Sequence, residues 1–197
     1  MNRSLILSAL AATTLAACST PAWVSPVEVT RFVGSAPAQL GTGTISISSD
    51  SMLADASVEY GLYRDALAAE LAALGYRVVD GQAAQVATLS VDERVVPAGQ
   101  RRGPVSVGGG AGVGSYGSSV GLGLGIDLTP PPADRVEREV AVTIRPAAGG
   151  QNLWEGRATY AATVNHELAQ PATAATRSMG ALFADFPGNS GETVEFE

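Results

Sequence analysis

The chain has 197 residues, a formal net charge of −7 and 46% hydrophobic residues, and its 12 basic residues are all arginine. A chain of this length and hydrophobicity can bury a core within one domain. Its acidic balance is poorly suited to a phosphate backbone, so we expect no nucleic-acid partner. The absence of lysine excludes a P-loop, a lysine Schiff base and a Ser–Lys dyad.

Residues 1–17 have the three parts of a secretory leader. Arg3 supplies a positive charge, an apolar run follows from Leu5 to Leu15, and small residues precede Cys18. The apolar run has eleven residues, whereas a transmembrane helix needs about 20. We therefore expect cleavage before Cys18, with residues 18–22 left as a short tether.

Cys18 is the single cysteine of the chain, so no intrachain disulfide can form. The run from Leu15 to Cys18 resembles the bacterial lipobox, in which the sulfur takes a diacylglycerol and the freed amine takes a third acyl chain. Each buried methylene contributes about 0.8 kcal/mol, so two or three chains hold a protein firmly on a bilayer. Ser19 favours the outer membrane, facing the periplasm, with the inner membrane as the alternative. A plain secretory leader with an incidental cysteine is the competing interpretation.

The first half of the mature chain predicts strands around one helix. Residues 23–33 and 41–48 have the alternation of strands. Residues 57–74 are a helix with an apolar face, which Asp55 or Ser57 can cap and Gly75 can end. Core packing is favoured over a binding stripe for this face, which consists of Tyr60, Tyr63, Leu67, Leu71 and Leu74.

Further strands are predicted at 76–80 and 85–96. Residues 136–145 and 153–164 form an antiparallel hairpin around Gly149-Gly150, with Val140, Val142 and Ile144 inward and Glu139 outward. Its second strand has an inward face of Trp154, Ala158, Tyr160, Ala162 and Val164.

A second helix is predicted at 171–186, beginning with Pro171 and ending before Pro187-Gly188. Its apolar stripe is Ala172, Ala175, Met179, Leu182 and Phe186. Residues 189–197 are expected to be a loose acidic tail. The resulting fold is α+β, with residues 23–188 as a single domain: a mainly antiparallel sheet of about five or six strands with two helices packed on one face.

A glycine-rich insert occupies residues 103–125. It contains chance matches to G-x-G-x-x-G at 112–117 and to G-x-S-x-G at 117–121. Both motifs require a helix to follow, which so many glycines prevent. We predict a mobile loop at 103–118 and a strand at about 119–128, closed by the prolines at 130–132.

The sequence contains no convincing catalytic arrangement, and we expect no enzyme, cofactor or bound metal. His166 is the only histidine, which excludes a multi-histidine zinc site. Asp92 and Glu93 could form a carboxylate site, but a solvated strand end explains them equally well. His166 is more simply a surface residue than part of a triad.

Several segments together resemble the bacterial lipoproteins catalogued as domain of unknown function 4136, over residues 22–188. Besides the lipobox, these segments are Leu62-Tyr63, Leu74-Gly75-Tyr76, Trp154-Glu155-Gly156-Arg157-Ala158 and Leu182-Phe183-Ala184-Asp185-Phe186-Pro187. The glycine-rich insert before the last hairpin is also similar. The resemblance implies no established activity, cofactor or partner.

Three functions compete at this point. The favoured one is a non-enzymatic accessory or interaction module of the cell envelope, anchored on a membrane through Cys18 and binding another envelope protein. The second is a small-ligand-binding lipoprotein with its site beneath the glycine-rich segment. The third is an envelope hydrolase that uses His166, Asp92 and Glu93.

Overall fold

The computed structural model describes residues 20–50, 57–99, 105–114, 117–126 and 132–197, and for 105–126 it describes the backbone alone. The predicted leader and Cys18 lie outside the described residues. The chain divides into two compact units, one of residues 22–97 and 134–197 and the other of residues 1–21 and 98–133. Each unit is considered by itself below.

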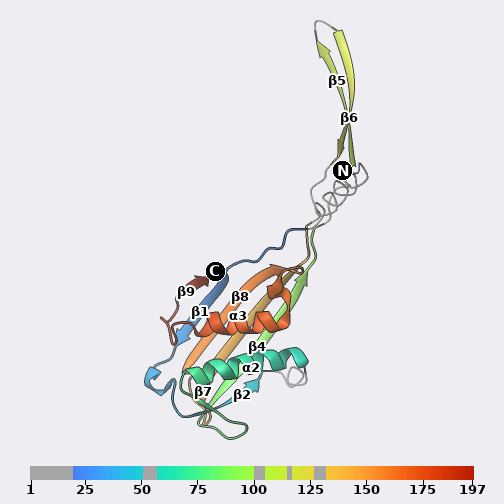
Figure 1. Cartoon of the computed structure of the whole chain (residues 1–197). Helices are drawn as coiled ribbons and strands as arrows, with labels where there is room; N and C mark the ends of the chain where they lie inside the picture. Colours follow the sequence, from blue (N-terminus) through green and yellow to red (C-terminus); the bar gives the residue numbers. More distant parts are fainter. Residues whose placement is uncertain (1–19, 51–56, 100–104, 115–116, 127–131) are drawn as a thin grey trace, which may run out of the picture. The chain divides into compact units, whose positions relative to one another are not determined.

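The larger unit is built on a seven-stranded sheet in the order β3-β2-β4-β7-β8-β1-β9 (Figure 1). Two helices, α2 and α3, cover one face of this sheet. We call the other side the open face. The strands are β1 (Val27–Val33), β2 (Thr44–Ser49), β3 (Arg77–Val78), β4 (Gln85–Val96), β7 (Arg135–Pro146), β8 (Trp154–Thr163) and β9 (Thr193–Phe196).

The fold is α+β as predicted, but the prediction of five or six mainly antiparallel strands was wrong in number and partly wrong in direction. β2 runs parallel to both β3 and β4, and the other pairs are antiparallel. α2 connects β2 to β3, and a helical crossover returns the chain in the direction in which it started. The predicted hairpin is confirmed as the antiparallel pair of β7 and β8.

Helix α2 (Val58–Ala73) begins and ends with the predicted signals. The Ser57 side chain accepts a hydrogen bond from the backbone N–H of Tyr60 at 3.4 Å. At the other end Gly75 has a φ of 101°, a conformation that favours glycine. The backbone N–H groups of Gly75 and Tyr76 donate to the carbonyls of Ala72 and Leu71, which satisfies two of the last carbonyls of the helix.

Helix α3 (Pro171–Phe183) ends before Phe186, and its apolar stripe differs from the prediction. Ala172 is exposed, and Ala174, Ser178 and Ala181 are buried. The stripe is broader because α3 contacts both α2 and the sheet. The buried Arg31 of β1 donates to the carbonyls of Leu182 and Ala181 at 3.0 and 2.8 Å, which caps the last turn.

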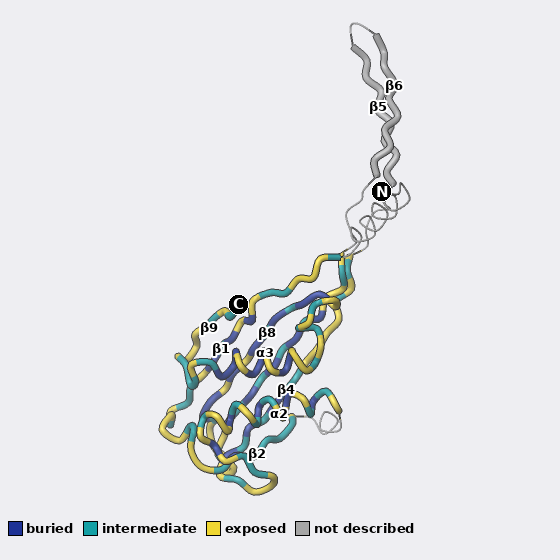
Figure 2. The backbone as a smooth tube through the Cα atoms, viewed as in Figure 1, coloured by how far each residue is buried: buried dark blue, intermediate teal, exposed yellow. Residues whose placement is uncertain are grey.

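The core lies between the sheet and the two helices (Figure 2). Its largest fully buried side chains include Trp154, Tyr63, Leu67, Ile144 and Met179. The predicted inward face of 153–164 is confirmed for Trp154, Ala158, Tyr160 and Ala162. Val164 lies beyond the end of β8 and is 43% exposed, so it does not belong to this face.

The predicted tail and the predicted glycine-rich loop both contain strands. Within the predicted acidic tail, β9 pairs antiparallel with β1, from Thr193 opposite Thr30 to Phe196 opposite Val27. In the glycine-rich segment, β5 (Val105–Gly114) pairs antiparallel with β6 (Gly117–Ile126) to form a sheet of its own. The loop predicted at 103–118 is therefore wrong for 105–114 and 117–118, which belong to strands. The strand predicted at about 119–128 is confirmed from 119 to 126. The remaining residues of these two predictions, 103–104, 115–116 and 127–128, lie outside the described residues.

Candidate functional site

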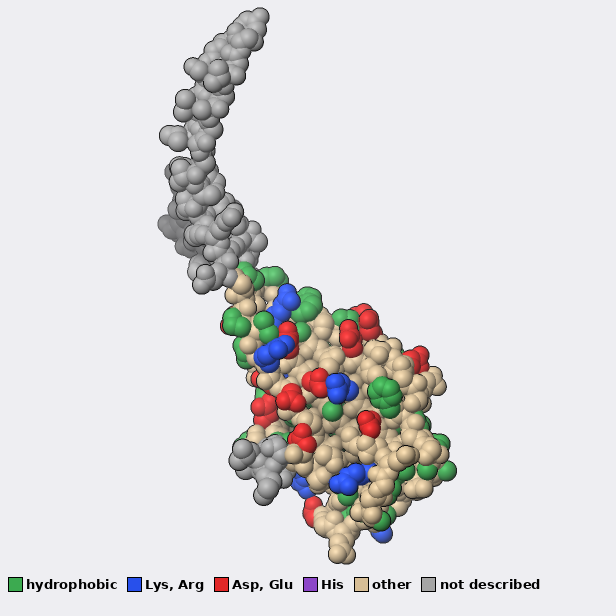
Figure 3. All heavy atoms as spheres, turned by 180° about the vertical axis from the view of Figure 1, so that it is seen from behind, with side chains coloured by type: hydrophobic (Ala, Val, Ile, Leu, Met, Phe, Trp, Pro, Cys, Tyr) green, Lys and Arg blue, Asp and Glu red, His purple; other side chains and the backbone are tan. Residues whose placement is uncertain are grey.

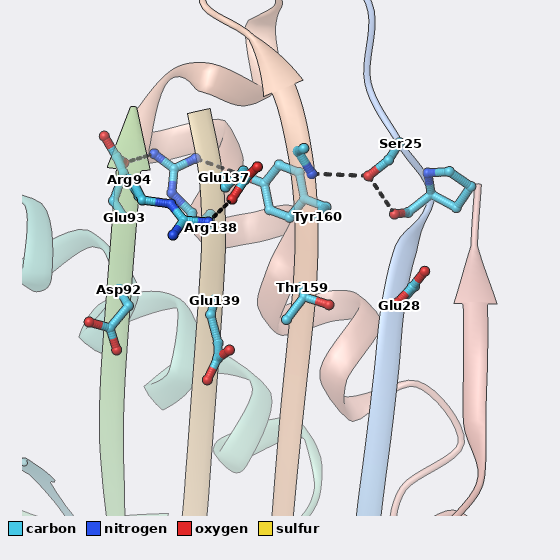
Figure 4. A pocket seen from close by; sticks show the side chains of 12 residues that line it. Ser25, Glu28, Asp92, Glu93, Arg94, Glu137, Arg138, Glu139, Thr159 and Tyr160 are labelled. Carbon is cyan, nitrogen blue, oxygen red and sulfur yellow. Dashed lines mark hydrogen bonds and ion pairs between the residues drawn. The ribbon is translucent and has the colours of Figure 1, made fainter. Parts of the chain in front are cut away.

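A row of acidic positions crosses the open face of the sheet. Asp92 of β4 lies opposite Glu139 of β7, Glu139 lies opposite Thr159 of β8, and Thr159 lies opposite Glu28 of β1. Figure 4 shows these four side chains along one line across the four strands. Residues opposite each other in a sheet have Cβ atoms about 4.5–5.5 Å apart, so the register brings three carboxylates onto one short stretch of surface.

This row borders a hollow of about 530 Å³ near the ends of the strands. Its wall is formed by β4, β7 and β8 and by the chain entering β1. Figure 3 shows the open face, where charged side chains lie among small polar and backbone atoms. The lining residues are Ser25, Pro26, Glu28, Asp92, Glu93, Arg94, Glu137, Arg138, Glu139, Thr159, Tyr160 and Ala161.

The negative charge of the hollow is only partly neutralised. Glu137 forms an ion pair with Arg94, and Glu139 Oε1 lies 3.3 Å from Arg157 Nε. Both pairs are largely exposed, so solvent weakens them. Asp92 and Glu28 have no ion pair within the part of the chain that the structure describes. Like charges opposite each other destabilise a sheet, so a cation bound here would relieve a repulsion.

Directly behind this row, on the helix-covered side, lies a buried polar row. Strand alternation places Glu93, Arg138 and Tyr160 opposite one another on β4, β7 and β8. The Arg138 side chain is 1% exposed and forms an ion pair with Glu93. Its Nη1 donates to Tyr160 Oη at 2.8 Å and to the Leu168 carbonyl at 3.1 Å. This arginine therefore ties the sheet to the segment before α3.

Glu59 of α2 brings a second carboxylate to Arg138. Its Oε1 lies 3.8 Å from Arg138 Nη2. Burial, followed by the neighbouring Glu93 carboxylate, raises the pKa of Glu59, and Arg138 partly opposes this rise. The cluster thus holds one buried cation between two carboxylates.

Two buried tyrosines should differ in their response to loss of the hydroxyl. Tyr160 Oη accepts from Arg138 and donates to the Leu168 carbonyl at 3.0 Å. We expect Tyr160→Phe to lower the free energy of unfolding by about 1–3 kcal/mol, because it removes the acceptor of one buried Arg138 hydrogen bond and one donor to the Leu168 carbonyl. The measurement is urea unfolding followed by circular dichroism.

Tyr63→Phe is the matched control. Tyr63 is fully buried, and its Oη has no hydrogen-bond partner among the described residues. Burial also raises the pKa of Tyr63, so the phenol stays neutral. Removing its hydroxyl should cost no stability. An equal loss in the two variants would show that the hydrogen bonds of Tyr160 do not account for the effect.

The residues considered for catalysis are not brought together as a site. His166 caps the short 3-10 helix η4 (Glu167–Ala169), where its Nδ1 accepts from the backbone N–H of Leu168 at 3.0 Å. Asp92 lies on the open face, and Glu93 lies on the other face beside Arg138. Within the described ranges there is no group of three His, Cys, Asp or Glu side chains placed to hold a metal ion.

Sequence reasoning missed Glu28 and Arg138. Glu28 could not be found because its neighbours in the row are far away along the chain. Arg138 could have been found from the sequence. The other even-numbered positions of its strand are apolar, so the alternation places Arg138 on the inward face as well. A charge at an inward position needs a partner nearby.

No family model and no curated protein sequence matches the chain. Among solved structures, a PDZ domain protein from Parabacteroides distasonis is similar over 99% of this chain, with 14% identity and a TM-score of 0.52. The chain spans 43% of the length of that protein. At this identity the likeness concerns the fold alone.

Two PelC dodecamer structures from Paraburkholderia phytofirmans are more weakly similar. One covers 82% of this chain and 95% of its own, with 13% identity and a TM-score of 0.41. The other covers 85% of this chain and 100% of its own, with 10% identity and a TM-score of 0.43. In the described part of the chain, no helix has the length and apolar character needed to cross a membrane.

Proposed function

We propose that the chain is a non-enzymatic binding module of the cell envelope, held on a membrane by acyl groups on Cys18, whose open sheet face docks a basic segment of another envelope polypeptide. The observation that carries the docking proposal is the acidic row of Glu28, Asp92 and Glu139 beside the 530 Å³ hollow.

The anchoring part of this proposal is supported by the sequence. The leader, the small residues before the cut and the single cysteine at that position fit lipidation. Mass analysis of the protein from its native cells should find an acylated Cys18 at the N-terminus. An intact leader or a free thiol at Cys18 would contradict it.

The charge of the hollow selects the partner. Asp92 and Glu28 lack an ion pair within the described ranges, and Glu139 shares a largely exposed one. Lysine and arginine side chains carry cationic ends on apolar stems, which suit a shallow surface of carboxylates between threonine and alanine. A phosphate or an acidic peptide would instead be repelled. The proposed partner surface is therefore basic.

A triple variant tests this proposal, with tetralysine peptide as the probe. Glu28→Gln, Asp92→Asn and Glu139→Gln remove the charges of the row and keep the shapes of the side chains. We expect about a tenfold loss of tetralysine affinity, because each exposed ion pair contributes about 0.2–1 kcal/mol. Titration calorimetry at low salt measures it, and added salt should weaken binding.

The control is a triple variant with the same change of net charge elsewhere. Asp65→Asn, Asp80→Asn and Glu167→Gln alter exposed carboxylates outside the hollow. Their effect on tetralysine binding should be small. If both triple variants lose affinity equally, the peptide responds only to overall charge and the open face is not a docking site.

A further inference from the structure

The ribbon formed by β5 and β6 has two chemically different faces. Ten residue pairs join the strands, from Val105 opposite Ile126 to Gly114 opposite Gly117 (Figure 1). Residues directly opposite share a face, and successive residues alternate between faces. The register therefore assigns every residue of 105–114 and 117–126 to one of two faces.

One face collects the apolar residues and the other almost only glycine. The first, called here the apolar face, has the positions Val105, Val107, Gly109, Ala111, Val113, Ser118, Val120, Leu122, Leu124 and Ile126. The second, called the glycine face, has the positions Ser106, Gly108, Gly110, Gly112, Gly114, Gly117, Ser119, Gly121, Gly123 and Gly125. Such segregation is what a ribbon needs to bury one side only.

The ribbon needs a partner for its apolar face. An isolated two-stranded ribbon is marginally stable in water, and glycine-rich strands lose more backbone entropy than others. Within the described residues of this unit, no further strand or helix forms a second layer. Burial of the apolar face against something else would supply the missing stabilisation.

The absence of charge indicates what this partner is. From Gly103 to Ile126 the sequence has no charged residue, between Arg102 and Asp127. Protein interfaces keep a polar rim, and exposed strands in water carry charges that prevent aggregation. The strands of the larger unit follow that rule, with Glu137, Glu139 and Arg157 on their open face. Acyl chains offer no polar partner and so suit a surface without charge.

We propose that the apolar face of the β5–β6 ribbon lies against the acyl chains at the surface of a lipid bilayer. The unpaired edges of the two strands have N–H and C=O groups that hydrocarbon cannot satisfy. The ribbon therefore lies in the interfacial layer, where water and headgroups reach these edges, and the glycine face is turned to water. This inference rests on the proposed function in one respect: the acyl groups on Cys18 bring the chain to a bilayer.

Site-directed fluorescence tests the proposal on the full chain purified from membranes. Two adjacent pairs are compared, Val107→Cys with Ser106→Cys and Val120→Cys with Ser119→Cys, each labelled with an environment-sensitive dye. The protein is reconstituted into phosphatidylethanolamine–phosphatidylglycerol vesicles that carry a nitroxide quencher on the acyl chains. We expect emission at 107 and 120 to be quenched several times more strongly than at 106 and 119.

The adjacent serines are matched controls because they share the place along the ribbon and differ only in face. Equal quenching in both members of a pair, or none in either, would overturn the proposal. Self-quenching between labelled copies at 107 and 120, without quenching by the lipid, would also overturn it, since the apolar face would then be covered by a second copy. The unsubstituted chain takes up dye only if Cys18 is free, so failure of the anchor is detected separately.

Discussion

Arg138→Met is expected to lower the free energy of unfolding by about 3 kcal/mol, the lower end of the range for removing one partner of a buried ion pair. The lower end applies because the Glu93 side chain is 33% exposed and can regain water. The substitution also deprives Tyr160 Oη and the Leu168 carbonyl of a donor. Urea unfolding followed by circular dichroism measures the loss.

Arg94→Met is the control from the neighbouring register position. Arg94 pairs with Glu137 on the same two strands, but its side chain is 75% exposed. Arg94→Met should therefore change the free energy of unfolding little. Adding Glu93→Leu to Arg138→Met should recover part of the loss, because it removes one of the two carboxylates that Arg138 neutralises and leaves only Glu59 without its cation. If Arg138→Met is no more destabilising than Arg94→Met, the buried cluster does not stabilise the fold.

Strand alternation and helix periodicity predicted the inner surface of the fold well, because both reflect burial along a short stretch of chain. The faces of α2 and of the β7–β8 hairpin are confirmed at nearly every position. The structure also explains one of the short sequence motifs. A Cβ at Gly156 would lie 2.3 Å from Trp154 Cη2, so the indole requires glycine two residues further along β8.

The strand order and the last strand could not be predicted from local pattern. β9 has four residues, two of them exposed, so no apolar run distinguishes it from a tail. It is a strand because β1 offers it an unpaired edge, and that edge exists only once the sheet has formed. In the glycine-rich segment a strand was predicted at about 119–128 but β5 was not, since eight of the ten positions on one face of the ribbon are glycine.

The candidate site was predictable only in pieces. Glu139 was placed outward correctly, and for Asp92 the sequence left a carboxylate site and a solvated strand end as equal alternatives. Their proximity, and the addition of Glu28, follow from pairings between β4, β7, β8 and β1 that no local pattern encodes. The proximity of Asp92 and Glu93 in the sequence does not make them a carboxylate pair. They are consecutive in β4, and consecutive residues of a strand point to opposite faces.

Trp154→Ala is expected to lower the free energy of unfolding by about 3–5 kcal/mol, the usual cost of deleting a large core side chain. Trp154 is fully buried, and its ring stacks on Phe183 with centroids 5.1 Å apart. Its Nε1 donates to the Pro187 carbonyl at 2.9 Å. The substitution thus leaves a cavity and an unpaired carbonyl at the junction of β8, α3 and the segment leading to β9. Urea unfolding followed by circular dichroism measures the loss.

The other tryptophan of the chain provides the control. Trp23 is 43% exposed, and the Arg135 guanidinium lies 4.7 Å from its ring centroid. An exposed contact of this kind contributes about 0.5–1 kcal/mol, and Trp23 lies outside the core, so Trp23→Ala should cost clearly less than Trp154→Ala. The difference between the two variants tests whether the core is centred where the structure places it. Similar losses in both would mean that Trp154 is not held between the sheet and α3, and the packing of α3 on β8 would have to be revised.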